Sequence, residues 1–236
     1  MHDEAIIAKA IKEAKAIKKK VAKRLVDHLP QEDSAVSVFM AGSPGAGKTE
    51  VARNMIRVFQ EKCGIDPVHI ENDELRKEFE DYDGQNSPLF QTPATLLVEA
   101  IHDRALQRDV SFILDSTLSS FSKAKDNIER SLKRGRYVQI IFVYQEPEQA
   151  WCLVKAREIV EGRRVPPDVF VNQFMESQRV VSELKQVFKH NVDIIFIEKN
   201  IDGINENPHF NVSDIDALLR KKYNRESLEA IVGLNK

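Results

Sequence analysis

Residues 35–49 read AVSVFMAGSPGAGKT, and this stretch decides the fold. Its first part, Ala35–Met40, is a short apolar run that predicts a buried strand. The part from Gly42 to Thr49 fits the pattern G-x-x-x-x-G-K-[ST] without a mismatch, and a helical pattern follows at Glu50–Glu61. A strand before the motif and a helix after it are the context in which it forms a phosphate-binding loop, or P-loop. The alternative, a glycine-rich turn with a chance Lys-Thr pair, would not require that context.

The residue types in this loop suit the binding of a nucleotide. Glycines let successive backbone N–H groups turn toward phosphate oxygens where a Cβ would collide, and the helix N-terminus beyond adds partial positive charge. Lys48 is expected to reach the β and γ phosphates, and the Thr49 hydroxyl to coordinate Mg²⁺. The GTP-reading pattern N-K-x-D does not occur, which favours ATP over GTP. The predicted nucleotide-binding residues are Gly42, Ser43, Pro44, Gly45, Ala46, Gly47, Lys48, Thr49 and Glu50.

Short, continuous apolar strands alternate with helices along the rest of the chain, which is typical of a parallel sheet covered on both faces. We therefore predict an α/β fold of the P-loop NTPase class, with three layers (α/β/α) and a mostly parallel sheet of five to six strands. Residues 1–236 are expected to form one domain, with a basic amphipathic helix at 1–30, a core at 35–200 and C-terminal helices at 201–236. Beyond the first strand, the predicted strands are 67–70, 112–114, 137–144 and 192–197, and the predicted helices are 74–80, 96–106, 122–134, 148–160, 167–188, 214–223 and 225–232.

The predicted N-terminal helix has an apolar stripe and a basic face. Ile7, Ile11 and Val21 belong to a series that recurs at steps of three and four, and the opposite side is rich in lysine. Such helices can bind a membrane surface or a partner. Because the apolar side lacks Trp and Phe, we favour a helix that packs on its own domain and exposes its basic face to solvent.

Composition restricts the classes of partner. The formal net charge of −2 provides no basic excess of the kind found in general nucleic-acid binders. The chain begins with acidic residues, and no apolar run approaches the ~20 residues that cross a bilayer, so we expect a cytoplasmic protein with neither a membrane nor a nucleic-acid partner. Cys63 and Cys152 are expected to be buried. No cluster of His, Cys and Asp indicates a transition metal, and His69 is interpreted as structural.

Two acids follow predicted strands. Asp115 comes directly after the strand 112–114 and is the predicted Mg²⁺ ligand together with Thr49, although it could instead cap the following turn. Asp73 follows the second strand and is expected at the same sheet edge as the P-loop, where it could accept the proton of an attacking hydroxyl. Position alone leaves two roles open for Asp73, this catalytic base and the N-cap of the helix 74–80.

A basic cluster lies near the end of the predicted helix 148–160. It consists of Arg157 and the turn 162–166, which contains Arg163 and Arg164. The planar fork of arginine binds phosphate oxygens in pairs, so these side chains are predicted to form a lid that offsets charge on a transferring phosphoryl group. The alternative is that they complement the helix dipole.

In this ordered set of motifs, from the N-terminal helix to about Phe188, the sequence resembles the zeta toxin family, the P-loop kinase toxins of bacterial toxin–antitoxin systems. The family's Asp-x-Asp, whose second acid is the catalytic base, reads Glu71-Asn72-Asp73 here, which favours the base role of Asp73. Its Glu-Ala-Ile, whose acid contacts the sugar substrate, resembles residues 99–101, and its acid-Gly-Thr element resembles residues 115–117. The resemblance implies that Asp73, Glu99, Asp115 and Thr117 bind the acceptor, and that Lys48, Asp73, Arg157, Arg163 and Arg164 are catalytic.

The same resemblance implies an activity and a partner. The activity is ATP-dependent phosphorylation of the sugar 3′-hydroxyl of UDP-N-acetylglucosamine, and the partner is an antitoxin whose helix obstructs the nucleotide site. The chain departs from the family at Ser119, where a substrate-facing arginine is missing, and residues 81–93 show no match, so a related nucleotide-like acceptor stays open. Two other classes also stay open: an ATPase or nucleotide switch acting through a protein partner, and a nucleic-acid kinase that uses the basic N-terminal helix.

Overall fold

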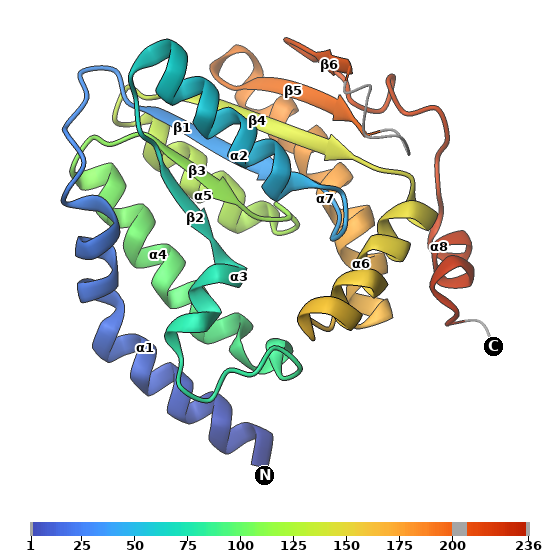
Figure 1. The fold of residues 1–236 in the computed structure, drawn as a ribbon. Coiled ribbons are helices and arrows are strands. Elements are labelled where there is room, and N and C mark those ends of the chain that lie inside the picture. The colour runs from blue at the N-terminus through green and yellow to red at the C-terminus, as the bar shows by residue number, and fades with distance from the viewer. Residues whose placement is uncertain (1, 200–206, 235–236) are drawn as a thin grey trace.

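A six-stranded sheet is the centre of the computed structural model, which describes residues 2–199 and 207–234. The strand order is β2-β3-β1-β4-β5-β6 (Figure 1). The first five strands in this order are parallel, and β6 joins β5 in the antiparallel direction. The predicted α/β fold and mostly parallel sheet are therefore confirmed. The strands are β1 (Val36–Ala41), β2 (Val68–Glu71), β3 (Phe112–Asp115), β4 (Tyr137–Tyr144), β5 (Asp193–Glu198) and β6 (Asn207–His209).

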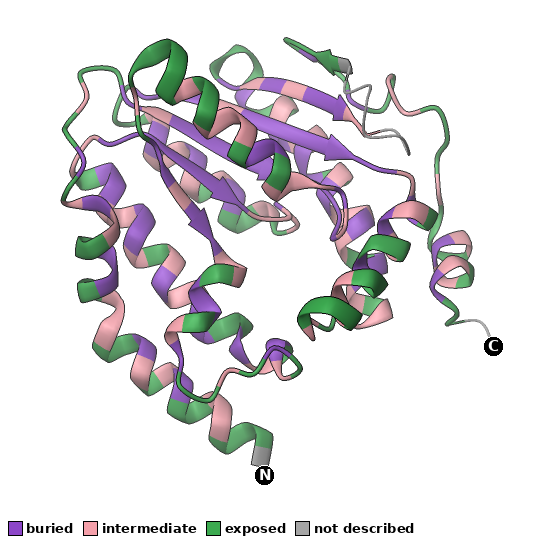
Figure 2. Cartoon of the chain, in the orientation of Figure 1, coloured by how far each residue is buried: buried purple, intermediate pink, exposed green. Residues whose placement is uncertain are grey.

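Helices cover both faces of the sheet and complete the three predicted layers (Figure 1). On one face, Val51 and Ala52 of α2 belong to an apolar cluster with side chains of β1, β3 and β4. On the other face, α4, α5 and α7 pack on a larger cluster, and Figure 2 shows that the central strands are buried along most of their length. The helices are α1 (His2–Val26), α2 (Lys48–Val58), α3 (Asn72–Leu75), α4 (Gln91–Gln107), α5 (Phe121–Leu132), α6 (Pro147–Glu161), α7 (Pro167–Phe188) and α8 (Arg225–Val232).

The parallel register brings three loops to one edge of the sheet. β1 lies between β3 and β4, and the pairing of β2 with β3 places Glu71 opposite Asp115. Because parallel strands all end at the same edge, the P-loop after β1, the helix α3 after β2 and the turn after β3 emerge side by side. Ligands of open α/β sheets bind outside the carboxyl ends of the strands, so this edge is where a site is expected.

A buried arginine ties the opposite edge of the sheet together. Arg136 donates hydrogen bonds to the hydroxyl of Ser37 (2.7 Å) and to the backbone oxygens of Val110 (2.8 Å) and Val36 (3.0 Å). Burial lowers the pKa of Arg136 to about 10, against the opposing charges of Asp109 and Glu32. The guanidinium therefore links the starts of three segments that meet at the amino ends of β1, β3 and β4.

The N-terminal helix is an integral part of the domain. α1 runs beside α4 (Figure 1), and Ala10 and Ala14 are almost completely buried in the main core. Asp27 receives hydrogen bonds from the guanidinium of Arg104 at 2.6 and 2.8 Å. The lysines of the opposite side are largely exposed. The interpretation of α1 as a helix packed on its own domain is thus confirmed.

The C-terminal segment differs from the sequence prediction. Residues 214–223 form turns rather than a helix, and the short strand β6 was not predicted. Ile215 is buried in an irregular segment, so its apolar character reflects tertiary packing rather than helical periodicity. Pro208 in β6 is tolerated because β6 is an edge strand. The predicted C-terminal helices thus reduce to α8 among the described residues, and residues 201–206 of that prediction lie outside them.

Two further expectations concern cysteines and membranes. Cys63 and Cys152 are both exposed, so the expectation that they are buried is wrong. Across residues 2–199 and 207–234, no helix has the length and apolarity to span a bilayer.

Candidate active site

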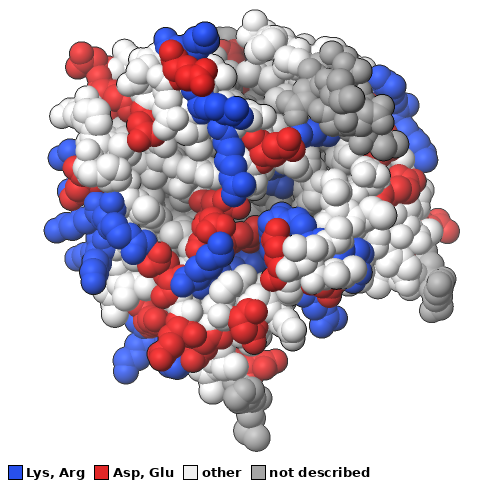
Figure 3. All heavy atoms as spheres, viewed as in Figure 1, with Lys and Arg blue, Asp and Glu red and all other residues white. Residues whose placement is uncertain are grey.

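A deep, open cleft lies at the carboxyl edge of the sheet. Its volume is about 1680 Å³, which exceeds the ~300–1,000 Å³ of a typical small-molecule pocket and leaves room for two ligands. The P-loop, α3 and the turn after β3 line one part, and α4, α5 and the segment around residues 157–166 line the rest. Figure 3 shows acidic and basic side chains gathered around a central hollow of the molecule. The cleft is therefore suited to charged, polar ligands.

The P-loop has the backbone shape that its glycines predicted. Gly45 and Gly47 adopt positive φ angles of 76° and 85°. A Cβ at Gly45 would lie 2.1 Å from the backbone oxygen of Ala150, so no other residue fits without a shift of the chain. The ammonium group of Lys48 donates to the backbone oxygens of Gly42 (3.0 Å) and Ser43 (2.7 Å). The lysine thus lies folded across its own loop.

Burial makes the Lys48 ammonium group favour a nearby anion. Desolvation lowers the pKa of Lys48 to about 8, and the nearby Asp115 carboxylate opposes this shift. A buried cation that has lost much of its hydration gains from an arriving phosphate, which replaces water with a fixed negative charge.

Two carboxylates lie beneath the P-loop, next to the hydroxyl of Thr49. The Thr49 hydroxyl donates to Asp115 at 2.7 Å and lies 3.3 Å from a carboxylate oxygen of Glu71. Burial, followed by the charge of Asp115, raises the pKa of Glu71. Burial also acts to raise the pKa of Asp115, but its contacts with His69, Lys48 and Thr49 outweigh that effect and lower it. Asp115 is thus the carboxylate that stays ionised beside Thr49.

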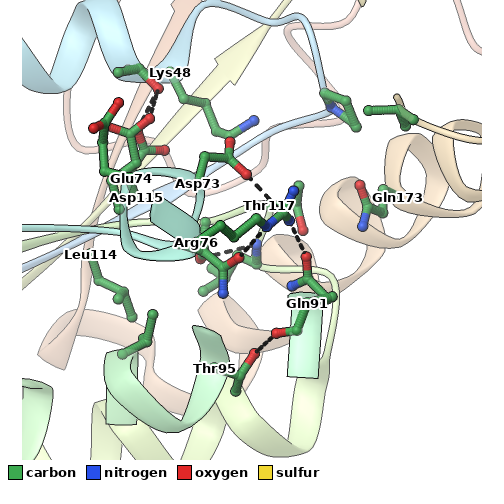
Figure 4. Close-up of a pocket in the computed structure, with 18 of the residues that line it drawn as sticks. Lys48, Asp73, Glu74, Arg76, Gln91, Thr95, Leu114, Asp115, Thr117 and Gln173 are labelled. Atoms are coloured by element: carbon green, nitrogen blue, oxygen red, sulfur yellow. Dashed lines mark hydrogen bonds and ion pairs between the residues drawn. The ribbon is translucent and has the colours of Figure 1, made fainter. Parts of the chain in front are cut away.

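Asp73 lies in the cleft between two arginines. It is the second residue of α3, whose N-cap is Glu71, so the N-cap alternative for Asp73 is wrong. One carboxylate oxygen is 2.5 Å from the guanidinium of Arg163, and the other is 3.3 Å from that of Arg76. Figure 4 shows Lys48, Asp73 and Arg76 in the same region of the cleft. The structure therefore brings the predicted base, the P-loop lysine and one predicted lid arginine together.

The other lid residues lie nearer the surface. Arg157 pairs with Glu161 at 3.2 Å on the last turns of α6, and Arg164 is exposed on the cleft wall. Arg163 is half-buried: desolvation lowers its pKa although Asp73 opposes this, and its buried Nε has no hydrogen-bond partner. Because Arg163 reaches across to Asp73, it does more than complement the dipole of α6.

The remaining predicted residues occupy separate parts of the cleft. Glu99 of α4 forms an ion pair with Lys123 of α5 at 3.0 Å, and both residues line the cleft. The Thr117 hydroxyl is 2.9 Å from that of Ser119, in the turn after β3. Glu50 is exposed, and its carboxylate accepts a hydrogen bond from Lys199 at 2.8 Å beside the P-loop.

Sequence reasoning missed two sets of residues. Arg76 is buried and bonds to Asn72 (3.3 Å) and to Gln91, so it holds α3 against the start of α4 (Figure 4). Its position three residues after Asp73 on a helix is a signal that could have revealed it. The second set is His69 and Glu71, which were not linked to each other in the sequence and whose ligand atoms lie within 4.8 Å of those of Asp115 in the structure.

The residues present fit a nucleotide with Mg²⁺. The Nε of Arg163 is a buried donor without a partner, and Lys48 is a desolvated cation. Both favour a polyphosphate. The Thr49 hydroxyl and the Asp115 carboxylate are hard oxygen donors, which Mg²⁺ prefers.

A strand, a glycine-lined loop and a helix at the carboxyl edge of a parallel sheet define a P-loop nucleotide-binding protein. The family model described as zeta toxin matches residues 19–209, which is most of the sequence. The chain belongs to the zeta toxin family, as its motifs indicated.

Solved structures with the same fold were found, whereas no curated protein matched the sequence. One is from a study of the PezAT chromosomal toxin–antitoxin system of Streptococcus pneumoniae, with a TM-score of 0.63, 17% identity and coverage of 94% of this chain and 93% of that one. Another is the AvrRxo1-ORF1:-ORF2 structure with ATP, with a TM-score of 0.60, 15% identity and coverage of 92% and 72%. A third is the Pnkp1/Rnl/Hen1 RNA repair complex, with a TM-score of 0.52, 18% identity and coverage of 82% and 54%. At these identities the likeness concerns the fold.

Proposed function

We propose that this protein is an ATP-dependent phosphotransferase whose acceptor is a hydroxyl of UDP-N-acetylglucosamine or a related nucleotide-like metabolite. The observation that carries the proposal is the position of Asp73, which faces the same cleft as the P-loop and lies 2.5 Å from Arg163. A nucleotide switch needs the P-loop but has no use for a carboxylate placed next to the transferring phosphate. A kinase needs such a carboxylate to accept the proton of its acceptor.

The reaction assigns a role to each group around Asp73. Lys48 and the P-loop backbone orient the triphosphate, and Mg²⁺, held through Thr49 and Asp115, would supply charge neutralisation between the β and γ phosphates. Asp73 takes the proton of the acceptor hydroxyl while the hydroxyl oxygen bonds to the γ phosphorus. At the same time, the bond from that phosphorus to the leaving oxygen of ADP breaks. Arg163, which is paired with Asp73, can move its guanidinium to the equatorial oxygens of the phosphoryl group as charge develops on them.

We assign the acceptor to the part of the cleft that α4 and α5 line, and this part is polar. Glu99, Lys123 and Asn127 line the cleft from α4 and α5, and Gln91 and Thr95 line it at the start of α4. Neutral and charged hydrogen-bonding groups of this density suit a sugar with several hydroxyls better than an apolar acceptor. The family resemblance implies that Glu99 contacts the sugar, and in this structure Glu99 forms an ion pair with Lys123 at 3.0 Å. Family membership also supports an antitoxin protein as a partner of this chain.

The test is mass spectrometry of a reaction that contains the protein, Mg²⁺, ATP and UDP-N-acetylglucosamine, with Asp73→Asn beside the wild type. We expect a product heavier by one phosphate, formed at least ~100-fold more slowly by the variant, because a general base commonly contributes that factor. The matched control is Asp126→Asn, an acid that also lines the cleft but has no assigned role. Equal product formation by Asp73→Asn would refute the base. ATP hydrolysis with no phosphorylated product from any nucleotide-sugar would refute the phosphotransferase and favour the nucleotide switch.

A further inference from the structure

Three side chains beneath the P-loop converge on one point. His69 and Glu71 are two residues apart on β2, and residues at this spacing lie on the same face of a strand. The register of β2 and β3 places Asp115 opposite Glu71. One ligand atom from each of the three lies within 4.8 Å of the others. The sheet itself, rather than a mobile loop, therefore holds a nitrogen and two carboxylates together.

The imidazole of His69 is the group that the proposed kinase chemistry leaves unexplained. Its Nε2 is buried and has no hydrogen-bond partner, and it lies 3.8 Å from a carboxylate oxygen of Asp115. That distance is too long for a hydrogen bond. A buried ring nitrogen at this distance from a carboxylate lacks the hydrogen-bond partner or other ligand that a buried polar atom normally has.

The gap fits a metal ion. Nitrogen and oxygen ligands bind Zn²⁺ at ~2.0–2.2 Å, so two ligands of one tetrahedral ion are separated by about 3.5 Å. The distance of 3.8 Å between His69 and Asp115 is close to this value, and side-chain rotations would draw in the rest of the group, whose ligand atoms all lie within 4.8 Å of one another. The Thr49 hydroxyl, at 2.7 Å from Asp115, is a fourth oxygen at the same place.

We propose that His69, Glu71 and Asp115 form a binding site for a divalent transition-metal ion, which the protein takes up without a nucleotide. Imidazole nitrogen suits zinc and its neighbours, whereas Mg²⁺ prefers oxygen ligands only and usually depends on substrate phosphates. The site shares Asp115 with the Mg²⁺ site of the nucleotide and differs from it in its imidazole ligand, so the two ions would compete for that carboxylate. The inference is independent of the role of Asp73, since Asp73 is not one of the proposed ligands.

Isothermal titration with Zn²⁺ alone, in the absence of nucleotide, tests the site. The exposed Cys63 and Cys152 are first replaced by serine, because thiolates bind zinc. We expect one ion per chain, binding that survives an excess of Mg²⁺, and a dissociation constant at least about tenfold higher in His69→Gln and in Glu71→Gln. The matched control is His28→Gln on the exposed surface after α1, which is expected to bind as the parent does.

X-ray absorption spectroscopy of the zinc-loaded parent protein covers the case in which a variant fails to fold. We expect a shell of nitrogen and oxygen ligands that contains a single imidazole. A shell with no imidazole or with several, the absence of a one-to-one site in the parent, or unchanged affinity in a folded His69→Gln protein would each overturn the proposal.

Discussion

The affinity for ATP should fall as the pH rises past the pKa of Lys48. In the nucleotide-free protein, burial lowers this pKa to about 8, from an ordinary value of 10.5. Bound phosphates favour the charged amine and raise the pKa again, so binding takes up a proton wherever free Lys48 is neutral. The ammonium is present at low pH and lost as the pH rises, so the affinity is highest below about pH 8. Between about pH 7.5 and about pH 9.5, the dissociation constant should rise about twentyfold.

The assay is titration calorimetry with ATP across this range, in buffers of different ionisation enthalpy, which also counts the protons taken up. The control is Lys48→Arg, because a guanidinium stays charged throughout and should bind more weakly but with little dependence on pH. A flat pH profile for the wild type, or the same slope in Lys48→Arg, would show that the lysine ammonium is not the group that titrates against the phosphates.

Two further predictions concern stability. Gly45→Ala should abolish ATP binding, because its Cβ would be 2.1 Å from the Ala150 oxygen. In a urea titration it should also lower the free energy of unfolding by well more than the ~1–2 kcal/mol that a left-handed alanine costs. The control is Gly64→Ala, with φ +66° and no atom within 4 Å of the added Cβ, which gives the backbone cost alone in the same titration. Arg136→Met should lower the free energy of unfolding by on the order of 3 kcal/mol, because two buried acceptors and one part-buried acceptor lose their donor. The matched variant Arg134→Met changes a neighbouring, exposed arginine and should cost less than about 1 kcal/mol. Equal losses within either pair of variants would contradict the respective argument.

Local signals were sufficient for most of the architecture. The apolar run before Gly42 and the helical pattern after Thr49 fixed the strand–loop–helix unit, because each segment obeys its own periodicity. The alternation of strands and helices then implied the parallel sheet, and with it the edge at which Asp73 and Asp115 meet the P-loop. These features depend on residues that are close in sequence.

Features that depend on distant partners were not predictable in this way. Residues 214–223 carry apolar side chains at helical spacing, yet those side chains pack an irregular segment onto the core. The link between Asp73 and Arg163 joins residues from opposite walls of the cleft, and its distance could not be read from either motif. His69 was interpreted alone, whereas its significance comes from the register of β2 with β3.

The packing of α1 on α4 also decides where this domain can be divided. The family match begins at residue 19, inside α1, so the matched segment is not a structural unit. A chain trimmed to that match would lose Ala10 and Ala14, both almost completely buried, and would present to water the side of α4 that they cover. Truncated variants, fusions and chimeras of this protein should therefore keep the whole of α1, because the packed helix begins well before the segment that the family model matches.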